Sequence, residues 1–195
     1  TAEFSRKSQG VPYGNLYPLV RQTEEDQKLY YKNIWGHLRG LKLQELNFNN
    51  DRKSPEFTEE LSFSGEKYAS RAGKRILLPL HFLHPSTYDL PNDDNRKLPI
   101  EIQRGRTYQE SFEFVLPVGY VAESIPENVD IENEFGTFST RIRVVEKEGR
   151  RSILLQRKYI INEGLWPIDS YDGYRNFMNQ INALSRQKAV IKETT

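Results

Sequence analysis

The stretch FGTFSTRIRVVEKEGRRSILLQRKYII, residues 135–161, decides the fold. Apolar and polar side chains alternate in both of its arms, on either side of the dipeptide Glu148–Gly149. The alternating apolar positions are Phe138, Ile142, Val144, Ile153, Leu155, Tyr159 and Ile161. Because successive side chains of a strand point to opposite faces, each arm is expected to be a strand that buries one face. Glycine accepts the positive φ of a tight turn, so the stretch predicts an antiparallel hairpin.

The same period of two recurs along much of the chain. It appears in residues 41–50, with a slip near Gln44–Glu45 that predicts a β-bulge, and again in residues 56–63, 75–80 and 108–116. In the last of these segments Glu110 is the polar exception on the apolar side. Strands with one buried and one wet face are typical of antiparallel sheets. We therefore predict a mainly β protein, an antiparallel β-sandwich that is immunoglobulin-like or related.

Two helices are expected beside the strands. Residues 23–39 carry apolar side chains at helical spacing, with Thr23 as N-cap and Gly40 as the stop signal. A second helix is expected to begin after Pro167. Its apolar stripe consists of Tyr171, Tyr174, Phe177, Met178, Ile181 and Leu184. We expect this stripe to pack on a sheet, because so many large apolar side chains would be a liability in water.

Composition excludes several function classes. The 195 residues include 28 basic and 27 acidic side chains, a balance that argues against nucleic-acid binding. No apolar run approaches the roughly 20 residues of a membrane-spanning helix. Cysteine is absent, which excludes disulfides, cysteine nucleophiles and thiolate zinc sites. No cofactor motif is present, so we expect no cofactor.

Candidate site residues are few, and no catalytic set is expected. His81 and His84 are weak candidates for a metal site, because side chains three apart in a strand point to opposite faces. A hydrolase that uses either histidine with a nearby acid is the least favoured interpretation. The acidic pairs, among them Glu59–Glu60, are expected to be solvated. The tyrosines that look free to face outward, and hence to contact a ligand or partner, are Tyr13, Tyr17, Tyr68 and Tyr88.

The expected domain organisation is a linker over residues 1–10 and a single β-sandwich module over residues 11–195. The chain begins with Thr1 and not with Met, so we expect it to be a fragment of a longer polypeptide. Whether the helix near residues 23–39 packs on this module or on a missing upstream core stays open, as does the oligomeric state.

Several segments resemble a domain of unknown function that follows a transglutaminase-like core in exported multidomain proteins of Bacteroidetes. The segments are YASRAGKRILLPL (68–80), RKLPIEI (96–102), LPVGYVAESIPENVDIENEFGTFS (116–139) and IDSYDGYRNFMNQINALSRQKAVIKE (168–193). The resemblance covers roughly residues 60–193. It implies a C-terminal β-sandwich in a periplasmic, secreted or cell-surface setting, with the upstream core of the same polypeptide as its partner.

We therefore expect a non-catalytic accessory module that packs on the upstream core or docks a partner. Any catalytic cysteine of the implied core would lie outside this chain, which has none. The alternative is a glycan- or peptide-binding module of the cell envelope, suggested by the 12% aromatic content.

Overall fold

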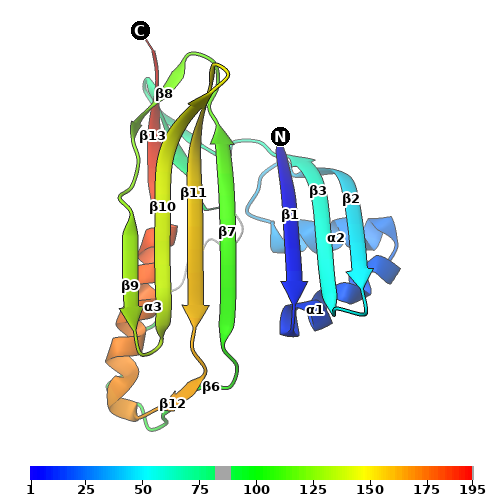
Figure 1. Cartoon of the computed structure of the whole chain (residues 1–195). Helices are drawn as coiled ribbons and strands as arrows, with labels where there is room; N and C mark the ends of the chain where they lie inside the picture. Colours follow the sequence, from blue (N-terminus) through cyan, green and yellow to red (C-terminus); the bar gives the residue numbers. More distant parts are fainter. Residues whose placement is uncertain (82–88, 195) are drawn as a thin grey trace. The chain divides into compact units, whose positions relative to one another are not determined.

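The computed structural model describes residues 1–81 and 89–194. The chain folds into two compact units, a first unit Thr1–Tyr68 and a second unit Ala69–Thr195. The sequence predicts one module after a linker; the structure instead has two units, and residues 2–9 form a strand. The predicted class is confirmed: the chain is mainly β, the strands of the described residues pair in antiparallel fashion, and helices lie near both ends (Figure 1).

The first unit is a three-stranded sheet with helices on one face (Figure 1). Its strands, in the order β1-β3-β2, are β1 (Ala2–Gln9), β3 (Glu56–Ser64) and β2 (Lys42–Asp51). The helices are α1 (Val11–Leu16), the 3₁₀ helix η1 (Tyr17–Arg21) and α2 (Glu24–Ile34). The predicted bulge in β2 is confirmed, because the register with β3 shifts between Leu43 and Glu45.

Strand β1 replaces the expected linker because it pairs with β3 along its whole length, from Ala2 opposite Phe63 to Gln9 opposite Glu56. Phe4 and Ser8 are buried on the face that the helices cover. The sequence signal is weak because Phe4 is the one large apolar side chain of the strand. The pairing depends on residues about fifty positions away.

Helix α2 begins where the sequence predicts and ends earlier. Thr23 caps it, since the Thr23 hydroxyl accepts a hydrogen bond from the Asp26 amide at 3.2 Å. The helix ends at Ile34 and not near Arg39. Trp35 leaves the helical conformation and is buried, with its ring against Phe4 and Phe63. Burial of this large ring in the core of the first unit outweighs the continuing apolar periodicity.

The second unit contains two four-stranded sheets and a small ribbon. The long sheet has the order β7 (Arg106–Val115), β11 (Arg150–Ile161), β10 (Gly136–Lys147) and β9 (Val129–Asn133). The short sheet has the order β4 (Ser70–Ala72), β5 (Arg75–Pro79), β13 (Lys188–Glu193) and β8 (Tyr120–Ser124). The ribbon pairs β6 (Ile100–Ile102) with β12 (Gly164–Trp166). The 3₁₀ helix η2 (Ile168–Ser170) leads into α3 (Tyr171–Ser185).

One face of the long sheet is covered in two different ways (Figure 1). At one end the short sheet packs on it to form a sandwich; the buried core residues there are Leu80, Leu116, Ile142, Ile153, Leu155, Ala189 and Ile191. At the other end α3 and the ribbon pack on it; the buried residues there are Ile100, Phe135, Phe138, Ile161, Trp166, Phe177 and Ile181. The whole predicted stripe of α3 belongs to this second cluster, so its packing on the sheet is confirmed.

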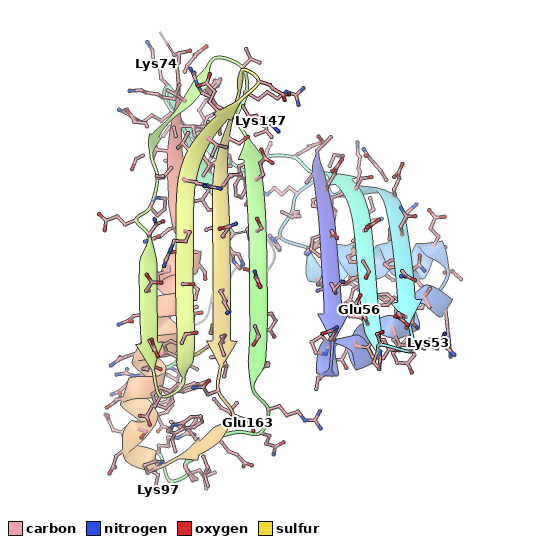
Figure 2. The ribbon with its side chains drawn as sticks, viewed as in Figure 1. Lys53, Glu56, Lys74, Lys97, Lys147 and Glu163 are labelled. Atoms are coloured by element: carbon pink, nitrogen blue, oxygen red, sulfur yellow. The ribbon has the colours of Figure 1, made fainter. Side chains whose placement is uncertain are left out.

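The hairpin that the opening stretch predicts is confirmed. β10 and β11 pair without interruption from Gly136 opposite Ile161 to Lys147 opposite Arg150. Glu148 and Gly149 form the turn, both with positive φ, at 52° and 75°. Charged side chains such as Lys147 mark this and other strand ends (Figure 2).

Candidate functional site

A buried ionic cluster lies on the covered face of the long sheet. It consists of His81, Glu110 and Arg157, and the last two are directly opposite each other on β7 and β11. Arg157 stands between Leu155, which belongs to the sandwich core, and Tyr159, which packs on the helix-covered core. Strand alternation therefore places a charged pair at the boundary between two apolar clusters.

The cluster is closely packed and largely shielded from water. The Glu110 Oε2 atom lies 3.3 Å from His81 Nε2 and 3.4 Å from Arg157 Nε. The side chains are 5% (His81), 14% (Glu110) and 9% (Arg157) exposed. Burial lowers the pKa of Arg157, and the Glu110 carboxylate opposes this effect. The Arg157 guanidinium also lies 5.2 Å from the centre of the Phe138 ring, a cation–π contact.

These groups are suited to holding strands together. A histidine beside a carboxylate can move protons when a substrate reaches it. Here His81 is buried and its ring stands edge-on to Phe112, with the centroids 5.8 Å apart. Glu110 on β7 contacts His81, in the segment after β5, and Arg157 on β11, so the cluster links these three parts of the chain.

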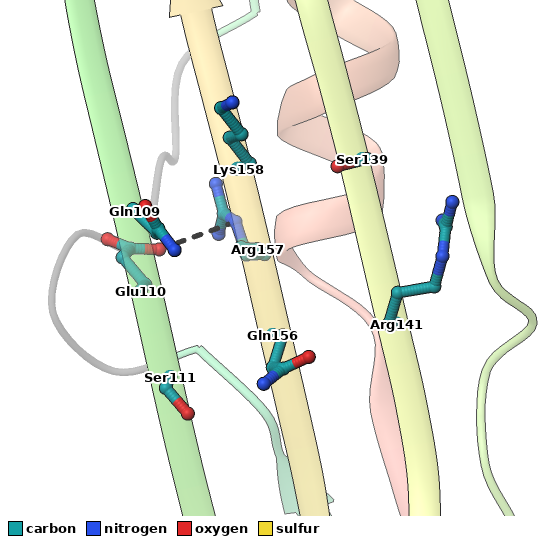
Figure 3. Close-up of a pocket in the computed structure, with 8 residues that line it drawn as sticks. All are labelled: Gln109, Glu110, Ser111, Ser139, Arg141, Gln156, Arg157 and Lys158. Atoms are coloured by element: carbon teal, nitrogen blue, oxygen red, sulfur yellow. Dashed lines mark ion pairs between the residues drawn. The ribbon is translucent and has the colours of Figure 1, made fainter.

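The opposite face of the same strands carries a shallow groove (Figure 3). Its volume is about 290 Å³. It is lined by Gln109, Glu110, Ser111, Ser139, Arg141, Gln156, Arg157 and Lys158. By strand alternation Glu110 and Arg157 point to the covered side, and the other six side chains form the solvent-facing surface. This surface is made of amides, hydroxyls and cations.

The first unit contains a second buried ionic cluster. Glu59, on the central strand β3, is fully buried and accepts two hydrogen bonds from the Arg6 guanidinium, one of them at 2.8 Å from Nη2. The Tyr31 hydroxyl donates a third. Burial, followed by the Glu59 charge, raises the pKa of Tyr31; burial alone would lower the pKa of Arg6, but Glu59 raises it. The expectation that Glu59 is solvated was wrong, because its inward position on β3 gives it these partners.

An exposed ionic network joins three strands of the short sheet. Glu123 on β8 accepts two hydrogen bonds from Arg75 on β5, and Lys192 Nζ on β13 lies 3.3 Å from its Oε1 atom. The hydrogen bond from Arg75, ahead of that from Lys192, lowers the pKa of Glu123 to about 2. The charged form of Glu123 is therefore favoured in the folded protein.

The predicted contact tyrosines are only partly accessible. Tyr13 and Tyr17 stack on each other with ring centroids 5.3 Å apart and pack against the core of the first unit. Tyr13 also donates a hydrogen bond to Asn50 at 3.1 Å. Tyr68 is half-buried, and burial raises its pKa. Tyr88 lies outside the described residues.

The two histidine candidates are not brought together in the part of the chain that the structure describes. His81 joins the buried ionic cluster, and His84 lies outside the described residues. Within residues 1–81 and 89–194 there is no group of three or more metal-ligating side chains. No helix among the described residues has the length and apolar character needed to cross a membrane.

Comparison with family models gives a match within the second unit. The model of the family described as "Domain of Unknown Function with solved-structure structure (DUF3858)" matches residues 74–191, which is more than half of the chain and lies within the second unit. No curated protein and no solved structure matches the chain.

Proposed function

The chain belongs to the DUF3858 family of domains of unknown function, and from that premise we propose that it is a non-catalytic accessory module of a larger, exported protein. In this proposal a transglutaminase-like core precedes it in the same polypeptide, and the module packs on that core or docks a partner. The setting is the periplasm or the cell surface of a member of the Bacteroidetes. The resemblance of residues 60–193 to the domain that follows such cores motivates each of these points.

The observation that carries the proposal is the use of buried charge in both units. Glu59 with Arg6 in the first unit, and Glu110 with Arg157 in the second, join neighbouring strands from inside the core. Each of these pairs is tied into the packing of its sheet. An architecture of this kind supports a role in presenting rigid surfaces.

Differential scanning calorimetry tests the docking role. The melting temperature of this chain alone is compared with that of the same residues in the parent polypeptide, which includes the upstream core. Docking predicts that attachment raises the melting temperature, because binding that requires the folded state stabilises it. If the melting temperature of this chain is the same alone and within the parent polypeptide, the docking role is refuted.

The second candidate function is ligand binding, and the groove on the open face of the long sheet favours it. Its solvent-facing lining of amides, hydroxyls and cations is able to form hydrogen bonds with a polar ligand. Screening the whole chain on a glycan array tests this function. Absence of binding to any sugar refutes the glycan version.

A further inference from the structure

Residues 89–99 form neither helix nor strand, and the first of them are bound by side chains of α3. Arg186, which follows the last residue of the helix, donates two hydrogen bonds to the Asp89 carboxylate, both at 3.0 Å. The Asn179 side chain accepts a hydrogen bond from the Leu90 amide at 2.7 Å and donates one to the Leu90 carbonyl at 3.1 Å. Helix α3 therefore holds both a side chain and the main chain of this segment.

The contacts continue towards the start of the helix. The Tyr171 hydroxyl donates a hydrogen bond to the Pro91 carbonyl at 2.9 Å, and the Arg96 guanidinium lies 4.6 Å from the centre of the Tyr171 ring. Successive residues of the segment thus meet the helix in reverse order, from Arg186 to Tyr171. The segment runs along α3 in the antiparallel direction.

The helix residues that hold the segment lie on one side of α3. Tyr171, Asn179 and Arg186 are eight and seven positions apart, about two helical turns each. They form a stripe, here called the outer stripe, that differs from the side on which Phe177 and Ile181 are buried against the sheet. The helix therefore has one apolar side for the core and one polar side that binds an extended chain.

The chemistry of the outer stripe selects an extended peptide with an acidic residue. An amide side chain that bonds both main-chain groups of one residue imitates a neighbouring strand, so Asn179 recognises backbone. Pro91 disfavours the helical conformation of Leu90 before it and thereby favours an extended one. The paired hydrogen bonds of Arg186 match the geometry of a carboxylate. The pattern that the stripe recognises is Asp-x-Pro.

The segment is held at the surface, which makes it displaceable. In the ion pair, the side chains of Asp89 and Arg186 are 48% and 41% exposed. Pro91 and residues 92–95 are exposed as well. Exposed ion pairs contribute little to stability, and segments with few buried contacts open at a low cost in free energy. A second peptide with the same pattern can therefore compete for the stripe.

We propose that the outer stripe of α3 is a peptide-binding surface, that residues 89–91 of the chain fill it, and that an acidic peptide of the Asp-x-Pro pattern from a partner protein displaces them. The internal segment acts as a competitor that keeps the surface closed until the partner is present. The inference goes beyond the proposed function, because it concerns a surface other than the groove and does not depend on docking to an upstream core.

Fluorescence anisotropy with a labelled synthetic peptide of residues 89–97 tests the proposal. The whole chain is titrated into the peptide, as the parent and as Asp89→Ala, which weakens the internal segment and leaves α3 intact. Because the internal segment competes for the surface, Asp89→Ala should bind the peptide at least about tenfold more tightly than the parent does.

Two asparagines of α3 provide a matched pair of variants in the Asp89→Ala background. Asn179→Ala should weaken peptide binding by about tenfold or more, because two hydrogen bonds to the peptide main chain are lost. Asn176→Ala, at an exposed asparagine outside the outer stripe, should leave the affinity unchanged. Equal effects of the two substitutions would overturn the proposal.

A charge reversal separates a binding surface from a purely structural contact. Arg186→Asp repels the internal Asp89, and this chain should prefer a peptide in which the first aspartate is replaced by arginine, by about tenfold over the unaltered peptide. The Asp89→Ala chain should show the opposite preference. An unchanged preference in Arg186→Asp, absence of saturable binding to both chains, or equally tight binding of a scrambled peptide of the same composition would overturn the proposal.

Discussion

Replacing Arg6 by leucine tests how much the buried carboxylate of Glu59 depends on its partner. The Glu59 side chain is 0% exposed and that of Arg6 is 27% exposed. Removing one member of a buried ion pair typically costs 3–5 kcal/mol, because the other charge stays desolvated. Since part of Arg6 already contacts water, we expect the lower end, a loss of about 3 kcal/mol in the free energy of unfolding of the first unit.

The protein carries a built-in probe for this measurement. Each unit holds one of the two tryptophans, both buried: Trp35 in the first and Trp166 in the second. Urea unfolding followed by fluorescence in a Trp166→Phe background therefore reports on the first unit. Lys7→Met is the matched control on the same strand, because Lys7 forms an exposed ion pair and should cost no more than about 0.5 kcal/mol.

A double-mutant cycle isolates the interaction between the two charges. Glu59→Leu removes the acceptor, and the double variant Arg6→Leu/Glu59→Leu should cost less than the two single changes added together, by roughly 1.5 kcal/mol or more. A loss below about 1 kcal/mol for Arg6→Leu, or simple additivity in the cycle, would refute the reasoning.

Three further predictions concern the second unit. Phe177→Ala, which empties a buried position of α3, should cost about 3–5 kcal/mol in urea unfolding, and a cost below 1 kcal/mol would contradict the packing of α3 on the sheet. In thermal melts, Gly136→Ala should cost several times the roughly 1 kcal/mol of an ordinary strained residue, because φ is 154° and a Cβ would overlap a carbonyl oxygen of β11. The control is Gly14→Ala in the first unit, where there is open space for a Cβ; it should be neutral or stabilising in the same melts. The lowered pKa of Glu123 means that its contribution to stability is complete above the ordinary value of 4.5 and is lost as the pH falls towards 2; Glu123→Gln should flatten that part of the acid profile, and an unchanged profile would show that Arg75 does not hold the carboxylate.

The local parts of the fold are predictable from the sequence because their signals are local. The hairpin of β10 and β11 follows from alternation around a turn with glycine, and the N-cap of α2 from Thr23. The stripe of α3 needs only the helical period, and it packs as predicted. Strand β1 and the division into two units escape the same reasoning, because they depend on pairing with β3 about fifty residues later.

The site residues are harder to predict for the same reason. The alternation of apolar and polar residues places both Glu59 and Glu110 on the apolar side of their strands. A charged residue at such a position is the signal available in the sequence. It does not name their partners, Arg6, Arg157 and His81, which come from other strands and segments. The groove likewise depends on the register of three strands, which brings Lys158 and Arg141 onto one surface.

The polar exception in β7 also has a consequence for how the long sheet assembles. A two-residue slip of β7 along β11 would keep every inward side chain inward, so the alternation of apolar residues cannot distinguish the slipped alignment from the native one. The slip would place Glu110 opposite Leu155 or Tyr159 in place of Arg157 and leave two buried charges without a counterion. The pair of Glu110 and Arg157 therefore imposes an energetic penalty on any sheet in which β7 and β11 are misaligned. It lies between the two apolar clusters, whose side chains alone would tolerate a shift of β7 along β11 by two residues.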